Sequence, residues 1–71
     1  MQSESLIALI EGPGAIRNLH NIAQHKSVCA LMFGPEDYAV EMGVSPQAKA
    51  IEHAAALVAM AATAAGKPSY G

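Results

Sequence analysis

The sequence predicts an α/β fold built on a parallel sheet. Two short apolar runs, at residues 6–10 and 28–33, each end in a turn that combines glycine, proline and acidic residues. An amphipathic segment of helical period lies between them, and a long alanine-rich segment follows the second run. Two strands separated by a single helix cannot form a hairpin, so we expect them to be parallel and joined by a right-handed crossover.

The first expected strand covers residues 5–10, which read SLIALI. Its apolar side chains are continuous rather than alternating, which is typical of a strand covered on both faces. A buried helical segment is the alternative, but six residues closed by Gly-Pro-Gly favour a strand. Over residues 14–25 the apolar side chains recur at intervals of three and four, which predicts one amphipathic helix.

The second expected strand covers residues 28–33 and ends at Gly34-Pro35. A short helical turn is expected over residues 36–42, with Gly43 as its end. The acidic residues of this second turn therefore follow the strand directly, as they do after the first strand.

A long helix is expected over residues 46–65. Ser45 is a suitable N-cap and Pro46 suits the first helical position, while Gly66 supplies the C-terminal end. Residues 67–71 then predict the beginning of a third strand.

Length, charge and cysteine content narrow the class of protein. The chain has 71 residues, enough for at most one small domain, and its formal net charge of −2 comes without a basic stripe, so nucleic acid is not an expected partner. Residues 54–65 are too short and too weakly apolar to cross a membrane, and residues 1–5 lack the basic region of a signal peptide. We expect a soluble, cytoplasmic protein in which Cys29, the only cysteine, is a small buried apolar residue.

Glu11 and Asp37 are the candidate functional residues, because each follows the carboxyl end of an expected strand. That edge of a parallel sheet hosts the active site in α/β folds, and neighbouring strands lie only about 4.8 Å apart. Two such carboxylates suit Mg²⁺, which takes one or two carboxylates together with water and substrate oxygens. Acid/base chemistry, with one raised pKa, and purely structural roles are the two alternatives.

Other polar residues are weaker candidates for a functional role. Glu36 is expected to cap the short helix rather than to bind a metal ion. The free backbone N–H groups after Gly12-Pro13-Gly14 suit an anion such as a carboxylate, although the segment is also an ordinary strand-to-helix turn. The three histidines, His20, His25 and His53, share no face and are expected to be solvated or to lie at helix ends.

Two segments resemble a known family. Residues 9–18 read LIEGPGAIRN and resemble its IE-(S/T)-P-x-(G/A)-(I/V)-x-N segment, and residues 31–38 read LMFGPEDY and resemble its G-x-(E/N)-D-(Y/L) segment. Residues 42–43 and 64–68 also fit. The family is the HpcH/HpaI aldolase/citrate lyase family, and the Glu-Asp-Tyr sequence is most similar to the citrate lyase beta subunit-like branch. One departure is Gly12, which stands where the family has Ser or Thr.

The resemblance implies a TIM (β/α)8 barrel with its active site at the carboxyl ends of the strands. It implies that Glu11 and Asp37 hold Mg²⁺, and that N–H groups near Gly14 and Ala15 help to bind a substrate carboxylate. It also implies a carbon–carbon lyase that cleaves a 3-hydroxyacyl thioester, such as a citryl or malyl thioester, into a 2-oxo acid and an acyl thioester. The acyl carrier would be coenzyme A or an acyl carrier protein, and a homo-oligomer is expected.

The length suggests a partial barrel. Two complete βα units and the start of a third strand cannot close a barrel, so residues 1–71 are expected to be a fragment of a single TIM-barrel lyase domain, inactive alone. The arginine that the family uses for its substrate, and the catalytic base, would lie outside this stretch. The alternative is a catalytically inactive small α/β protein that self-associates through its open sheet edges and apolar helix faces.

Overall fold

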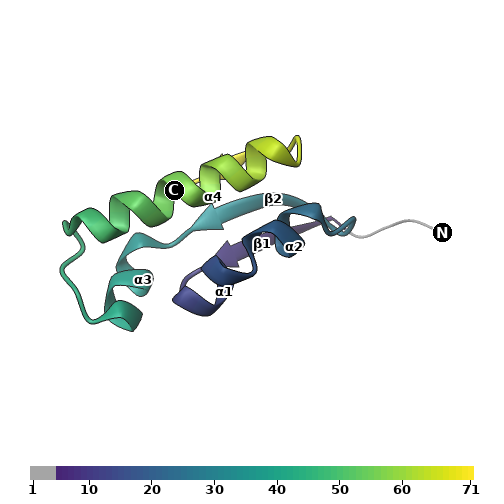
Figure 1. Ribbon diagram of the computed structural model, residues 1–71. Helices are drawn as coiled ribbons and strands as arrows, with labels where there is room; N and C mark the ends of the chain where they lie inside the picture. Colours follow the sequence, from purple (N-terminus) through teal and green to yellow (C-terminus); the bar gives the residue numbers. More distant parts are fainter. Residues whose placement is uncertain (1–4) are drawn as a thin grey trace.

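Three parallel strands form the sheet of the computed structural model, which describes residues 5–71 (Figure 1). Strands β1 (Leu6–Ile10), β2 (Val28–Phe33) and β3 (Ser69–Tyr70) lie in the order β1-β2-β3, and both pairs are parallel. The predicted parallel α/β sheet, with two βα units and the beginning of a third strand, is therefore confirmed.

Four helices lie in the two crossovers. Helices α1 (Pro13–Arg17) and α2 (Leu19–Gln24) connect β1 to β2, and helices α3 (Pro35–Met42) and α4 (Lys49–Ala64) connect β2 to β3. Helices α2 and α4 contact each other and both contact β2, so they cover the same face of the sheet (Figure 1). Right-handed crossovers between strands in sequential order place successive helices on one face in this way.

The core lies between that sheet face and the helices. Leu31 at the centre of β2 and Ala62 of α4 are both fully buried. Small side chains on α4 allow its backbone to approach the sheet closely. The buried cluster consists of Ile10, Leu19, Ala23, Leu31, Phe33, Tyr38, Ala39, Ile51, Ala54, Val58 and Ala62.

The opposite sheet face is open within the described residues, so the expectation that the first strand is covered on both faces is wrong here. The side chains of Ile7, Leu9, Met32 and Tyr70 alternate onto this face and are 54%, 52%, 39% and 52% exposed. We call these four residues the open sheet face. No helix of residues 5–71 packs against it, because both crossovers lie on the other side.

Cys29 is exposed, contrary to the expectation that it is buried. The pairing of β1 with β2 is irregular at this point, because Leu6 pairs with Val28 whereas Ile7 pairs with Ala30. Cys29 lies in the irregularity and has no partner in the register. A bulge of this kind locally disrupts the ladder, and the alternation of side chains breaks with it.

The helix expected over residues 14–25 is divided at Asn18. This residue adopts φ −109° and ψ 17°, ends α1 and begins α2. Its Nδ2 donates a hydrogen bond of 3.1 Å to the carbonyl of Gly14. Asparagine competes for backbone groups in this manner, which explains an interruption that the apolar pattern does not reveal.

The long helix begins at Lys49 rather than at Pro46. Ser45 Oγ accepts the N–H of Gln47 at 3.2 Å and donates to Gln47 Oε1 at 2.8 Å, so the serine makes a local turn instead of a helix cap. The predicted end at Gly66 is confirmed. Gly66 has φ +72°, and the N–H of Lys67 donates to the carbonyl of Ala62 at 2.8 Å, as in a Schellman motif.

Lys67 also joins the end of α4 to the end of α2. Its Nζ donates to the backbone carbonyls of Ala23 and of His25, the second at 2.9 Å. These carbonyls belong to the last turn of α2 and its C-cap, where a cation is favourable. The contact fixes the first crossover to the segment that leads into β3.

No helix among residues 5–71 is long and apolar enough to cross a membrane. The expectation that the N-terminus is not a signal peptide concerned residues 1–5. Residues 1–4 of this segment lie outside the part of the chain that the structure describes.

Candidate functional site

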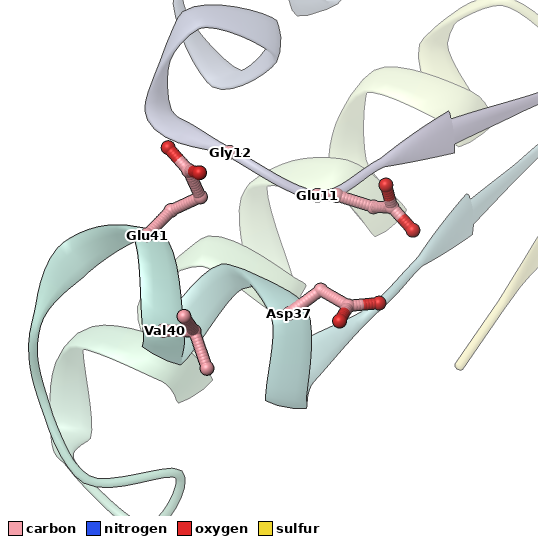
Figure 2. Close-up of a pocket in the computed structure, with 5 residues that line it drawn as sticks. All are labelled: Glu11, Gly12, Asp37, Val40 and Glu41. Atoms are coloured by element: carbon pink, nitrogen blue, oxygen red, sulfur yellow. The ribbon is translucent and has the colours of Figure 1, made fainter.

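Glu11 and Asp37 lie at the same edge of the sheet. Glu11 directly follows β1, and Asp37 lies in the first turn of α3, just after β2. The two strands end in register, because Ile10 pairs with Phe33 and the N–H of Gly34 donates to the carbonyl of Ile10 at 3.0 Å. The structure thus brings together the two carboxylates that the sequence singles out (Figure 2).

Gly34 lies next to both carboxylates. A Cβ placed on this glycine would lie 3.5 Å from Glu11 Cγ, 3.8 Å from Glu11 Oε2 and 3.7 Å from Asp37 Oδ2. One oxygen of each carboxylate is therefore within 3.8 Å of a single point. The missing side chain leaves a small cradle in contact with both groups.

An open hollow of about 410 Å³ surrounds this pair. It is lined by Glu11, Gly12, Asp37, Val40 and Glu41 (Figure 2). Within residues 5–71 no lysine, arginine or histidine side chain lines the hollow, so its charge is negative. Glu11 is half-buried and Asp37 is exposed, which leaves both accessible to ions from solvent.

Glu41 is a lining residue that the sequence interpretation missed. A Cβ placed on Gly12 would lie 3.7 Å from Glu41 Cγ, and Figure 2 shows the Glu41 carboxylate beside Gly12, pointing away from the Glu11–Asp37 pair. Its position four residues after Asp37 on α3 places both side chains on one helix side, a spacing that is visible in the sequence.

The donor set fits Mg²⁺ rather than a metal held entirely by protein groups. No group of three or more His, Cys, Asp or Glu side chains within residues 5–71 could hold a metal ion. Glu41 and Glu36 therefore do not complete a ligand set with the pair. Magnesium commonly binds through one or two carboxylates and keeps several waters, and two carboxylates that line one open hollow match this donor set.

Glu36 does not cap α3 by a side-chain hydrogen bond, contrary to expectation. The N-cap of this helix is Gly34, and no side chain bonds to its first N–H groups. Glu36 is exposed in the first turn, where a negative charge is favourable beside the positive pole of the helix.

The backbone N–H groups of Gly14 and Ala15, which we predict to bind a carboxylate, differ in whether they already donate a hydrogen bond. The N–H of Ala15 donates to the carbonyl of Gly12 at 3.1 Å, so it is already engaged in the first turn of α1. The N–H of Gly14 has no backbone acceptor among the described residues. Gly14 is thus the better placed of the two for a substrate carboxylate, and the assignment stays a prediction.

The histidines lie away from the hollow, as expected. His20, His25 and His53 are all exposed, and none lines it. His25 lies at the C-terminal end of α2, where its Nδ1 accepts the N–H of Ser27 at 3.1 Å.

Sequential parallel strands, helices on one sheet face and paired carboxylates at the carboxyl edge define a segment of a TIM-barrel type of protein. The family model described as HpcH/HpaI aldolase/citrate lyase matches residues 1–70 of the sequence. The chain therefore belongs to the HpcH/HpaI aldolase/citrate lyase family. No curated protein gives a significant sequence match.

Solved structures agree with this assignment. RipC from Yersinia pestis is 26% identical with a TM-score of 0.85, over 92% of this chain and 31% of that one. Macrophomate synthase is 28% identical with a TM-score of 0.82, over 92% of this chain and 24% of that one. The citrate synthase SbnG shares the fold at 20% identity and a TM-score of 0.85, over 89% of this chain and 26% of that one. The chain thus spans 24% to 31% of the length of these proteins.

Proposed function

We propose that this chain is the metal-binding segment of a magnesium-dependent carbon–carbon lyase of the citrate lyase beta subunit-like branch. Its substrate would be a 3-hydroxyacyl thioester, citryl or malyl, carried on coenzyme A or an acyl carrier protein. The observation that carries the proposal is the convergence of Glu11 and Asp37 over the cradle of Gly34. Family membership supports the class of chemistry.

The proposed reaction breaks the bond between the hydroxyl-bearing carbon and the α-carbon of the thioester. The hydroxyl group loses its proton and becomes the carbonyl of the 2-oxo acid. The electron pair of the broken bond moves into the thioester enolate, which then takes up a proton to give the acyl thioester. A Mg²⁺ ion held by Glu11 and Asp37 would supply positive charge that stabilises negative charge on the oxygen of the 2-oxo acid.

The residues of this chain would bind and orient rather than transfer protons. Glu11 and Asp37 would hold the metal ion, and the N–H groups of Gly14 and Ala15 would hold the substrate carboxylate, with Gly14 the less encumbered. No basic side chain among residues 5–71 lines the hollow, so the substrate arginine and the catalytic base would come from elsewhere. We therefore propose that residues 1–71 are a fragment of one lyase domain and do not turn over substrate alone.

Two further expectations belong to the proposal. We place the enzyme in the cytoplasm, and we expect it to be a homo-oligomer without nucleic-acid or membrane partners.

The alternative function is a catalytically inactive, self-associating α/β protein. The open sheet face favours this alternative, because Ile7, Leu9 and Tyr70 are each more than half exposed and contiguous exposed apolar surface promotes association.

Thermal unfolding with and without Mg²⁺ tests the metal-binding proposal. An ion that binds only the folded chain stabilises it by about 2.7 kcal/mol at 100 times its Kd. We expect Mg²⁺ to raise the Tm of the wild-type chain and of Glu52→Gln, an exposed charge on α4. Glu11→Gln and Asp37→Asn should abolish the increase. Equal increases in all four proteins would contradict the proposal.

Addition of a 2-oxo acid tests the substrate class. Glyoxylate or oxaloacetate should raise the Tm further in the presence of Mg²⁺, and should do nothing in its absence or in Asp37→Asn. A 2-oxo acid that has no effect beyond that of Mg²⁺ would count against lyase chemistry at this site while leaving metal binding intact.

A further inference from the structure

We infer that Gly34 is a positioning residue that keeps the space between Glu11 and Asp37 open to a hydrated divalent cation. The inference rests on the proposed function, since it concerns the same pair of carboxylates. It adds a residue that is not itself a ligand but that controls access to both ligands.

The backbone conformation does not require glycine at position 34. Gly34 has φ −103° and ψ 93°, an extended conformation that any L-residue adopts. Its backbone is held on both sides, because its N–H donates to the carbonyl of Ile10 at 3.0 Å and its carbonyl accepts the N–H of Tyr38 at 2.9 Å. The position is therefore fixed, and the direction in which a side chain would leave it is fixed as well.

That direction leads toward both carboxylates. A Cβ there would lie 3.5 to 3.8 Å from atoms of Glu11 and 3.7 Å from Asp37 Oδ2. These are ordinary van der Waals distances, so a methyl group would be accommodated without displacing the backbone. Steric exclusion of a side chain by the fold therefore does not explain the glycine.

A methyl group would, however, occupy the space that an ion and its waters need. Magnesium binds oxygen at about 2.1 Å in octahedral geometry and retains several waters. The methyl carbon would contact one oxygen of each carboxylate. It would exclude water from these oxygens without acting as a metal ligand itself. The methyl group should therefore weaken ion binding without lowering the stability of the metal-free chain. In the metal-free chain no other group of the described residues occupies that space.

Direct titration with Mn²⁺ tests the inference. Manganese is a hard ion that suits carboxylate and water ligands as Mg²⁺ does, and free aqueous Mn²⁺ is measured by its electron paramagnetic resonance signal. We would titrate the wild-type chain, Gly34→Ala, Asp37→Asn and Glu52→Gln, and record the Tm of each without metal. Gly34→Ala should bind Mn²⁺ at least tenfold more weakly than wild type, with an unchanged metal-free Tm. Glu52→Gln should bind as the wild type does.

Each other outcome has a distinct meaning. If Gly34→Ala binds Mn²⁺ as tightly as wild type, the role of Gly34 is wrong and the proposed function stands. If Gly34→Ala loses its folded structure, the inference is also wrong, because it requires that the fold tolerate the methyl group. If the wild-type chain binds no Mn²⁺, or if Asp37→Asn binds it equally well, the proposed metal site fails and the inference fails with it.

Discussion

The aromatic rings of Phe33 and Tyr38 lie 5.4 Å apart between centroids and are tilted by 56°. Phe33 is the last residue of β2 and Tyr38 lies on α3, and both side chains are buried. Tyr38 directly follows Asp37 in the chain. The ring contact therefore fixes the first turn of α3 against the strand end and so determines where the Asp37 carboxylate lies.

Replacement of Tyr38 tests this anchoring. Tyr38→Ala should lower the free energy of unfolding by about 3 kcal/mol, because it removes a buried aromatic side chain and its ring contact. Tyr38→Phe should be close to neutral, since none of the side-chain hydrogen bonds within residues 5–71 involves the Tyr38 hydroxyl and no side-chain oxygen there is buried without a partner. Urea unfolding of the two variants measures the difference, and equal stabilities would contradict the anchoring role.

Lys67 should be important for stability despite its charge. Lys67→Met removes the hydrogen bonds from Nζ to the carbonyls of Ala23 and His25, and should cost about 2 kcal/mol, since bonds to charged groups contribute about 1.5 to 3 kcal/mol. Lys26→Met is a matched control at an exposed position. Urea midpoints that fall equally in both variants would show that the two carbonyls do not need the lysine.

Gly66 should not tolerate a side chain, whereas Gly14 should. Gly66 has φ +72°, so Gly66→Ala should lower the free energy of unfolding by about 1 to 2 kcal/mol. Gly14 lies in α1 with no atom within 4 Å of a Cβ, so Gly14→Ala should leave stability unchanged or raise it by about 0.5 kcal/mol. Thermal melts compare the two, and a similar loss in both would contradict the Schellman geometry at the end of α4.

The open sheet face should drive concentration-dependent association. Leu9→Lys and Met32→Lys place charges on this face, and charged residues suppress association of exposed strands. Both variants should sediment as smaller species than the wild-type chain at high concentration. Met60→Lys, on the exposed side of α4, is the control for added charge. If Met60→Lys has the same effect, the association does not depend on the open sheet face.

The sequence was sufficient to predict the β2 strand and the location of both candidate ligands. Residues 28–33 are an apolar run closed by Gly-Pro, and the observed strand has these bounds. Glu11 and Asp37 lie close together because the two neighbouring strands pair in parallel. The sequence alone is enough to predict this pairing.

Other features depend on tertiary contacts that the sequence does not display. A continuous apolar run does not distinguish a strand covered on both faces from one whose second face is open, so the exposure of Leu9 could not be predicted. Ser45 followed by Pro46 suits either a helix N-cap or a local turn, and the turn to Gln47 is the one formed. Glu41 reaches the hollow only because α3 packs beside the loop at Gly12.

The irregular pairing at Leu6 and Ile7 has a consequence for how this segment can vary in length. Beyond it, residues Ile7 to Ile10 pair one to one with Ala30 to Phe33, and Glu11 follows at once. Deletion of a single residue within β1 would turn its side chains to the opposite face and carry Ile10 out of the core. Homologous sequences should therefore gain or lose residues between α3 and α4, around Gln47, and should keep a constant number of residues from Ile7 to Glu11.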